Sequence, residues 1–216
     1  AIFDCDVTLV DEQANVCLAM EEAFAAASLE APSRALIRRA VGLSLPQAMA
    51  MLLPGSTPAE QEMLAESYRL AFREHRRLGQ VDEPLFDGIA PLLRQLHAEG
   101  WQLAVATGKS RRGLRHCLAT HGVSDLFSSL QTADDHPSKP DPAMIAAVLW
   151  ETGIDAKDAV MIGDTSFDML MASAAGVRAI GVDWGYHHAE ELLATGAERV
   201  AETVEELAGM LEVTSG

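Results

Sequence analysis

Two carboxylates lie close together near the start of the chain. Asp4 and Asp6 follow an apolar stretch of three residues and precede Thr8. If residues 1–5 form a buried strand, side chains two positions apart project to the same side, so the carboxylates are expected roughly 7 Å apart at the strand end. Two such acids repel, and a divalent cation, a raised pKa on one acid, or both would compensate. Taken alone, the segment is equally compatible with a turn that carries solvated acids.

Three later segments place further polar groups after apolar runs or in a loop between prolines. In chain order they are Thr107-Gly108, Ser138-Lys139-Pro140-Asp141-Pro142 and Gly163-Asp164-Thr165-Ser166-Phe167-Asp168. A lysine in a loop is usually solvated when it is considered alone. The position of Lys139 between the other two segments favours a functional role instead.

The acid pair, the Thr-Gly, the Lys-Pro and the Gly-Asp-x-x-x-Asp segments resemble, in type and order, the four signature motifs of the haloacid dehalogenase-like hydrolase superfamily. Each motif alone is weak, but the four together are specific, and they extend over nearly the whole chain. The resemblance implies that Asp4 is a nucleophile that forms an aspartyl-phosphate. It implies that Asp6 is the general acid and base. Thr8 would support the turn, or would simply be a hydroxyl at the strand end.

The resemblance assigns the remaining motif residues to phosphate and metal binding. Thr107, the amide of Gly108 and the charge of Lys139 would hold the phosphoryl oxygens. Asp164 would bind Mg²⁺ together with the carboxylate of Asp4 and the backbone carbonyl of Asp6, which is an oxygen-only ligand set suited to a hard cation. Asp168 would be a further or water-mediated metal ligand, or would stabilise a helix N-terminus.

Composition agrees with one enzyme-sized protein. The 216 residues, 49% of them hydrophobic, suffice for one large domain with a smaller insert. No apolar run approaches the roughly 20 residues that span a bilayer, and no basic-then-apolar leader precedes the first motif. The three cysteines, Cys5, Cys17 and Cys117, lack metal-ligand spacing and are typical of reduced thiols. We therefore expect a cytoplasmic protein without a membrane partner.

The charge of the chain argues against nucleic acid as a partner. The net charge is −16 and only three lysines are present, whereas binding to a phosphate backbone needs a basic surface. A small phosphorylated metabolite could still be attracted locally by a cation and a few basic groups in a cleft. The densest basic cluster comprises Lys109, Arg111, Arg112 and Arg115, and the pattern favours a solvated helix face for it.

The pattern after residue 81 predicts an α/β fold: a Rossmann-like parallel sheet wrapped by helices. The predicted strands are residues 1–5, 103–106, 129–131, 160–162 and 179–182, with a short one near 199–200. Helical spacing relates Ile89, Leu92, Leu93 and Leu96, and a last helix carries Val204, Leu207 and Leu211.

Residues 12–80 have a different composition. They are rich in Ala, Leu, Met and Glu and are interrupted at Pro32, Pro46, Pro54 and Pro58, which predicts four helices and no strand. The insert resembles the helical cap of one subclass of these hydrolases, so we predict a core domain of residues 1–11 and 81–216 and a cap of residues 12–80. Ligands of open α/β sheets bind beyond the carboxyl ends of the strands, where the cap would close over the motifs.

Departures from the family pattern narrow the function. Val7 stands where many members have Gly, and Glu12 stands where a small hydroxyl residue is frequent. Asp6 disfavours a dehalogenase, and the absence of Lys from residues 11–80 disfavours cleavage of phosphonates through a Schiff base. Sugar phosphomutases of this type carry a His at the position of Val16, so a mutase is also disfavoured.

The sequence therefore predicts a Mg²⁺-dependent phosphatase that resembles the phosphoglycolate phosphatase subgroup. Alternatives are a sugar phosphomutase of the same fold and a non-catalytic binding or regulatory module. Arg38 and Arg39, before Gly42 in a predicted interhelical loop, could bind an acidic group of the substrate, or could lie on a solvated helix face. We expect a monomer or a homodimer.

Overall fold

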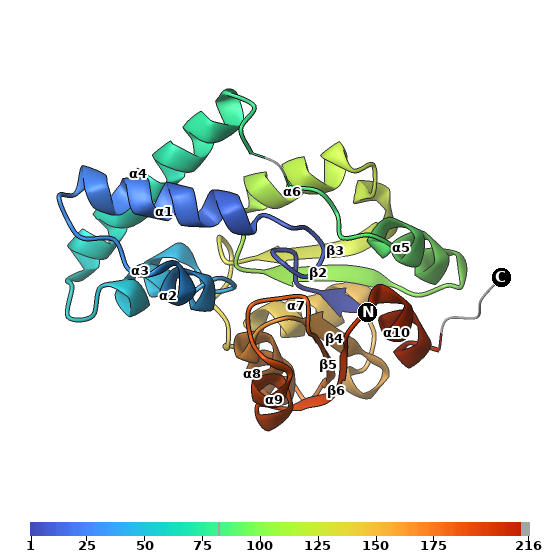
Figure 1. Cartoon of the computed structure of the whole chain (residues 1–216). Helices are drawn as coiled ribbons and strands as arrows, with labels where there is room; N and C mark the ends of the chain where they lie inside the picture. Colours follow the sequence, from blue (N-terminus) through green and yellow to red (C-terminus); the bar gives the residue numbers. More distant parts are fainter. Residues whose placement is uncertain (82, 213–216) are drawn as a thin grey trace.

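Six parallel strands form the centre of the protein. The computed structural model describes residues 1–81 and 83–212. The strands are β1 (Ile2–Phe3), β2 (Leu103–Thr107), β3 (Phe127–Thr132), β4 (Val160–Gly163), β5 (Arg178–Val182) and β6 (Ala197–Ala201). Their order in the sheet is β3-β2-β1-β4-β5-β6, with every pair parallel, as Figure 1 shows. This confirms the predicted α/β fold.

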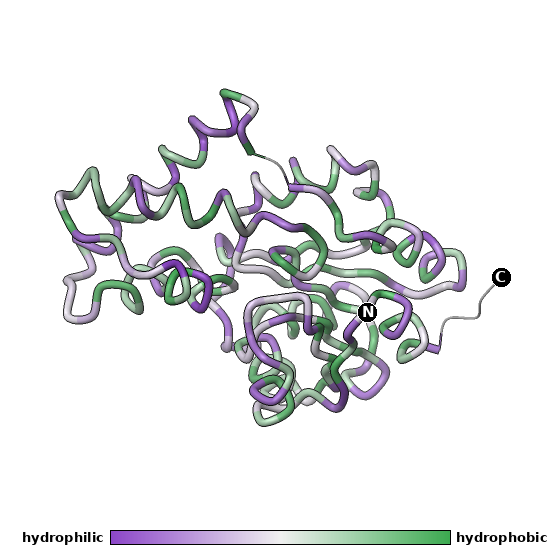
Figure 2. The backbone as a smooth tube through the Cα atoms, in the orientation of Figure 1, coloured by the Kyte–Doolittle hydropathy of each residue, from purple (hydrophilic) through white to green (hydrophobic). Residues whose placement is uncertain are grey.

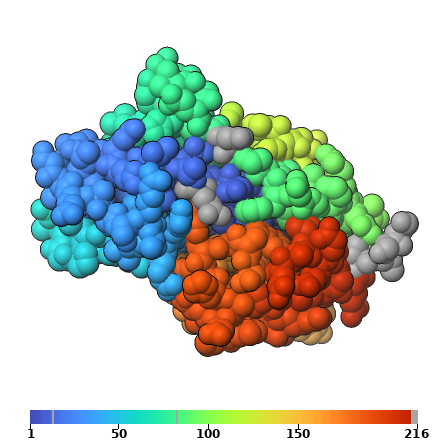
Figure 3. All heavy atoms as spheres, in the orientation of Figure 1, coloured from blue at the N-terminus to red at the C-terminus, as the bar shows by residue number. Residues whose placement is uncertain are grey.

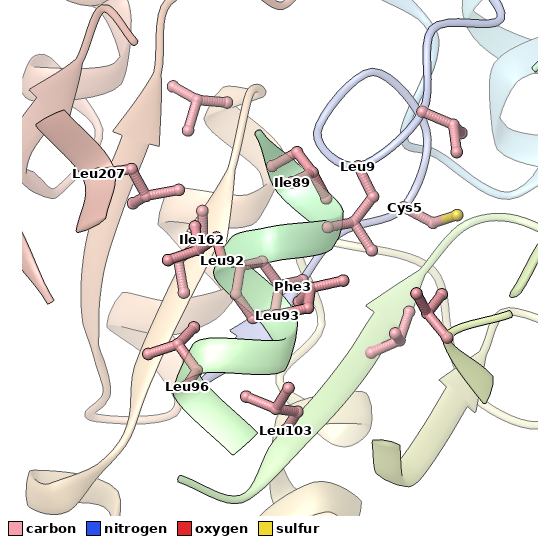
Figure 4. Packing of buried hydrophobic residues seen from close by; sticks show 14 of the residues in the cluster. Phe3, Cys5, Leu9, Ile89, Leu92, Leu93, Leu96, Leu103, Ile162 and Leu207 are labelled. Carbon is pink, nitrogen blue, oxygen red and sulfur yellow. The ribbon is translucent and has the colours of Figure 1, made fainter. Parts of the chain in front are cut away.

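Helices cover both faces of the sheet, and alternate strand residues serve one face or the other. Phe3 and Val105 pack with α5 (Ile89–Ala98), α6 (Arg111–Thr120) and α10 (Val204–Met210), as Figure 4 illustrates for α5. Ile2 and Ala104 pack with α7 (Ala143–Thr152), α8 (Ser166–Ala174) and α9 (Ala189–Ala194) on the other face. The period of two in side-chain direction thus fills two cores from one set of strands.

The four helices between β1 and β2 form a separate lobe, the cap. They are α1 (Gln13–Ala26), α2 (Arg34–Arg39), α3 (Leu45–Leu52) and α4 (Pro58–Arg77). They enclose their own apolar cluster, which includes Phe24, Ile37, Met49 and Leu64. In Figure 2 much of the long α4 is hydrophilic, in contrast with the largely hydrophobic central strands. The predicted helical cap is confirmed, and no strand lies among its described residues. The exact division at residues 11/12 and 80/81 stays a prediction.

The prolines of the cap differ in what they do. Pro46 and Pro58 lie in the first turns of α3 and α4, where a missing N–H costs nothing, so they begin helices rather than break them. Thr57 and Glu60 close a capping box at the start of α4. Pro32 and Pro54 lie between helices, as predicted.

The first strand is shorter than predicted. It ends at Phe3, although the Asp4 amide still donates to the carbonyl of Ile162 at 2.9 Å. The chain then turns, with Val7 at φ 61° and with hydrogen bonds from the Val7 amide to Val10 O. Asp4 therefore lies at the carboxyl end of β1, whereas Asp6 belongs to the turn that follows. The strand predicted over residues 1–5 is therefore too long.

The cap lies against the core on the side where the strands end. Figure 3 shows the blue cap surface directly beside the orange core surface. Arg39 at the end of α2 forms an ion pair with Glu191 of α9, and the Ser44 amide donates to Ser138 Oγ at 2.7 Å. Within the described residues, each helix is too short or too polar to cross a membrane.

Candidate active site

Five motif residues converge beyond the carboxyl ends of the central strands. Asp4 follows β1, Thr107 ends β2, Lys139 lies in the loop before α7, Asp164 follows β4 and Asp168 lies in the first turn of α8. All five side chains are fully buried. Parallel strands bring their carboxyl ends to one edge of the sheet, so segments separated by up to 164 positions form one polar centre.

Lys139 lies between two carboxylates. Its Nζ is 2.8 Å from Asp4 Oδ1 and 2.6 Å from Asp168 Oδ1. Burial acts to lower the pKa of Lys139, but the charges of Asp168 and Asp4 outweigh it and raise that pKa. Burial raises the pKa of Asp4 to about 7, although Lys139 opposes this shift. An ammonium with two charge-assisted partners is thus the fixed positive charge of this centre.

Asp164 is held by hydrogen bonds from two other elements. Thr8 Oγ1 donates to its Oδ1 at 2.9 Å, and the Tyr186 amide donates to its Oδ2 at 3.1 Å. Burial, then the charges of Asp168 and Asp4, raise the pKa of Asp164 well above its ordinary value. A Cβ on Gly185 would lie 2.0 Å from Asp164 Cβ, so only glycine fits there. Thr8 therefore orients an acid, which is a more specific task than the predicted support of the turn.

Three carboxylates could hold a metal ion. One ligand oxygen each of Asp4, Asp164 and Asp168 lies within 4.8 Å of the others. Asp4 Oδ2 is buried without a hydrogen-bond partner, and the charges of the three acids exceed the single charge of Lys139. A buried, oxygen-only, negatively charged group with an unpartnered oxygen fits a hard divalent cation. The sequence predicted these three acids as ligands together with the carbonyl of Asp6, and their binding of Mg²⁺ stays a prediction.

Asp168 stabilises the start of α8, which is one of the two roles that the sequence left open, and its role as a metal ligand stays a prediction. Its Oδ2 accepts from the Thr165 amide at 3.1 Å and from Thr165 Oγ1 at 2.7 Å, which forms a capping box at the start of α8. Its Oδ1 faces Lys139. The helix start therefore fixes the carboxylate that completes the acidic group.

The cap approaches the core closely at Gly108. A Cβ at this position would lie 2.6 Å from the carbonyl oxygens of both Gly42 and Leu43. The loop between α2 and α3 therefore lies against the segment that follows β2. Thr107 Oγ1 accepts from the Lys109 amide at 3.2 Å, which ties the first residues after β2 together. The roles of Thr107 and Gly108 toward phosphate stay predictions.

Asp6 belongs to a second charged cluster rather than to the acidic group around Lys139. Lys109 Nζ is 2.7 Å from Asp6 Oδ1, 2.7 Å from Glu12 Oε2 and 3.1 Å from Glu83 Oε1. We call Lys109, Asp6, Glu12 and Glu83 the Lys109 cluster. The prediction of a solvated helix face is wrong for Lys109, because it precedes α6 and its side chain is only 8% exposed.

The pKa values of Glu12 and Glu83 in the Lys109 cluster are shifted in opposite directions. Burial, then the charge of Asp6, raise the pKa of Glu12 well above its ordinary value. Burial acts to raise the pKa of Glu83 as well, but the charges of Lys109 and Arg76 outweigh it and lower that pKa to about 2. A small hydroxyl residue, which is frequent in the family at the position of Glu12, has no carboxylate to pair with Lys109. This departure from the family pattern was the one sequence signal that pointed to the cluster.

The two cap arginines lie at the end of α2 and are exposed. Arg39 makes a bidentate pair with Glu191, at 2.7 Å from Nη2 to Oε1 and 3.1 Å from Nη1 to Oε2. Arg39 thus joins the cap to α9. Arg38 and Arg39 stay candidates for substrate binding that no contact in the structure tests.

Comparisons with known proteins agree with this geometry. Residues 1–182 match the family model described as haloacid dehalogenase-like hydrolase. The chain is 35% identical over 213 residues to a protein of Dickeya dadantii named "Probable phosphatase IndB", which covers 96% of this chain and 91% of that protein. It is 29% identical over 195 residues to a phosphoglycolate phosphatase of Vibrio cholerae, which covers 88% and 86%.

Solved structures share the whole fold. A hydrolase from Pseudomonas syringae has a TM-score of 0.86 at 26% identity and covers 100% of this chain and 98% of its own. A predicted phosphatase from Clostridium acetobutylicum has a TM-score of 0.87 at 24% identity, with 98% and 96% covered, which supports the fold. These matches confirm the predicted enzyme class, a hydrolase whose curated relatives are phosphatases. With its four motifs gathered at one edge of the sheet, the chain belongs to the haloacid dehalogenase-like hydrolase family.

Proposed function

We propose that this protein is a Mg²⁺-dependent phosphatase that hydrolyses a small phosphorylated metabolite, of the phosphoglycolate kind, through an aspartyl-phosphate on Asp4. The observation that carries the proposal is the burial of Asp4, Asp164 and Asp168 around one lysine, Lys139. A cluster with this much negative charge is costly to bury unless it binds a cation. The bound cation and Lys139 would then attract and stabilise a phosphoryl group.

The first half-reaction transfers the phosphoryl group to the protein. A carboxylate oxygen of Asp4 attacks phosphorus, and the bond between phosphorus and the ester oxygen breaks. Asp6 donates a proton to the leaving alkoxide. Lys139 and Thr107 offset the negative charge that spreads over the phosphoryl oxygens. Bound Mg²⁺, held by Asp4, Asp164 and Asp168, would supply further positive charge beside these oxygens.

The second half-reaction regenerates Asp4. Asp6, now ionised, takes a proton from a water molecule as its oxygen attacks phosphorus, and the bond from phosphorus to Asp4 breaks. Inorganic phosphate leaves and Asp4 is again a carboxylate. The division into two displacements replaces one difficult step by two easier ones.

The substrate class rests on relatives and on the cap. Several curated relatives are named phosphoglycolate phosphatase, at identities from 26% to 30%. Because Arg39 already pairs with Glu191, Arg38 is the better candidate to meet an acidic group of the substrate. The compartment we propose is the cytoplasm, because all three cysteines are free thiols.

Phosphate release from small phosphorylated metabolites tests this proposal. The screen compares phosphoglycolate, sugar phosphates and p-nitrophenyl phosphate, each with and without Mg²⁺, and uses Asp4→Asn as the matched control. We expect Mg²⁺-dependent release that the control lacks. Absence of release from every monoester would refute the proposed function and favour a binding or regulatory module. Transfer of phosphate between positions of a sugar would instead identify a mutase.

A further inference from the structure

Lys109 joins a proposed catalytic acid to both connections between the core and the cap. Glu12 lies in the first connection, directly before α1, and Glu83 lies in the returning connection after α4. One ammonium therefore contacts Asp6 and one carboxylate from each connection, within 2.7 Å, 2.7 Å and 3.1 Å. None of the four motif roles described above includes Lys109.

Lys109 and its partner Glu83 are each held by further contacts. The Lys109 amide donates to Thr107 Oγ1 at 3.2 Å, which anchors the lysine to the end of β2. Glu83 accepts from Arg76 of α4 at 2.6 Å. His121 Nε2 donates to the carbonyl of Glu83 at 2.7 Å. A chain of contacts thus connects the end of β2, through Lys109 and Glu83, to Arg76 of α4, the last helix of the cap.

Asp6 depends on this cluster for its orientation. Asp4 is held by the strand register, because its amide bonds to β4. Asp6 lies after β1 in the turn that contains Val7 at φ 61°. The contact from Lys109 to Asp6 Oδ1 is the ion pair that fixes the Asp6 carboxylate. Removal of Lys109 would leave three buried carboxylates without that ammonium.

We infer that Lys109 is a positioning residue for Asp6, and that Glu12 and Glu83 make this positioning depend on how the cap joins the core. The inference rests on the proposed function, in which Asp6 protonates the leaving group. A displaced Asp6 should impair cleavage of poor leaving groups, such as the alkoxide of phosphoglycolate. It should spare p-nitrophenyl phosphate, whose leaving phenolate needs no proton.

The experiment compares kcat/KM for these two substrates in Lys109→Met, because kcat/KM reports steps up to the departure of the leaving group. We expect a fall of about 10- to 100-fold for phosphoglycolate, part of the 10²- to 10⁴-fold that general acid–base catalysis supplies, and less than about 3-fold for p-nitrophenyl phosphate. Lys157→Met, at a lysine that is 76% exposed, is the matched control and should change neither value. Equal losses on both substrates, or none on either, would overturn the inference.

A double-mutant cycle separates this inference from the proposed function. In an Asp6→Asn background, Lys109→Met should have no further effect on phosphoglycolate, because the residue it positions is gone. An undiminished further loss would overturn positioning through Asp6. Full activity of Asp6→Asn on phosphoglycolate would refute the proposed role of Asp6 itself.

Variants of the connections test the second half of the inference and guard against misfolding. Glu12→Gln and Glu83→Gln keep the size of each side chain but replace the carboxyl group that Lys109 contacts with an amide, so Lys109 is held less firmly. We expect the same selective loss for phosphoglycolate, smaller than that of Lys109→Met. If Lys109→Met does not fold, the double variant Lys109→Met/Glu12→Gln is used in both assays instead. The double variant removes one of the acids that Lys109→Met leaves without a partner. Unchanged substrate preference in both glutamine variants would overturn the link to the cap.

Discussion

Two buried lysines of this protein are surrounded by carboxylates, but they join different parts of the fold. Lys139 meets Asp4 and Asp168, which the sheet and the start of α8 hold in place. Lys109 meets Asp6 from a turn and Glu12 and Glu83 from the connections to the cap. The first centre belongs entirely to the core, whereas the second spans both lobes. The proposed nucleophile is thus supported from within the core, whereas the proposed general acid is supported from the connections to the cap.

The comparison predicts that the two acids of the first motif fail in different ways. Asp4→Asn should abolish turnover of every substrate, on the order of 10⁴-fold or more, because an amide cannot act as the nucleophile. Asp6→Asn should lose most for substrates with poor leaving groups. Phosphate release from purified variants, with circular dichroism to confirm folding, measures both. Near wild-type release by Asp4→Asn would be incompatible with an aspartyl-phosphate.

Removal of the metal should affect the Lys139 centre and leave the Lys109 cluster intact. Excess chelator should abolish activity, and Asp164→Ala should weaken Mg²⁺ binding, because the remaining acids would repel each other and the substrate. Titration calorimetry with Mg²⁺ provides a readout independent of turnover. Lys109 pairs with Asp6, Glu12 and Glu83 rather than with the three acids of the metal group, so the Lys109→Met variant should bind Mg²⁺ as the wild type does. Full activity in excess chelator would contradict the proposed cofactor.

Replacement of the core lysine should impair all substrates alike. Lys139→Met removes a charge aimed at the phosphoryl oxygens, which costs roughly 3 to 4 kcal/mol of transition-state stabilisation, or about 10²- to 10³-fold in kcat/KM. Phosphoglycolate and p-nitrophenyl phosphate share these oxygens, so both should lose the same factor. A loss confined to phosphoglycolate would show that Lys139 assists departure of the leaving group. Lys139 and Lys109 would then not differ in the step that they support.

The same contrast explains what the sequence could predict. Asp4 and Asp164 follow apolar runs that are visible in the sequence, whereas the grouping of Asp4, Asp164, Asp168 and Lys139 was predicted from the resemblance to the four family motifs. The Lys109 cluster depends on a turn and two connections, which no periodicity describes. Glu83 therefore escaped prediction, and Lys109 was assigned to a solvated face. Tyr186 and Gly185 were missed as supports of Asp164, because a backbone donor and a close approach leave no side-chain pattern.

The smallest predicted effect concerns the two arginines at the end of α2. Arg38→Ala should raise KM for phosphoglycolate several-fold and spare p-nitrophenyl phosphate, because only the first substrate carries an acidic group to bind. Arg39→Ala should change KM for both substrates equally and by less than about 5-fold. Its pair with Glu191 is partly exposed, and such ion pairs contribute about 0 to 1 kcal/mol.

Glu191→Gln is the matched control for Arg39, since it breaks the same pair from the core side. If Arg39 acts only by joining the cap to α9, the two variants should have the same small effect and their combination should add little. A selective rise in KM for phosphoglycolate in Arg39→Ala, absent from Glu191→Gln, would show instead that Arg39 leaves its partner to bind the substrate. Arg39 would then contribute to substrate specificity from the cap.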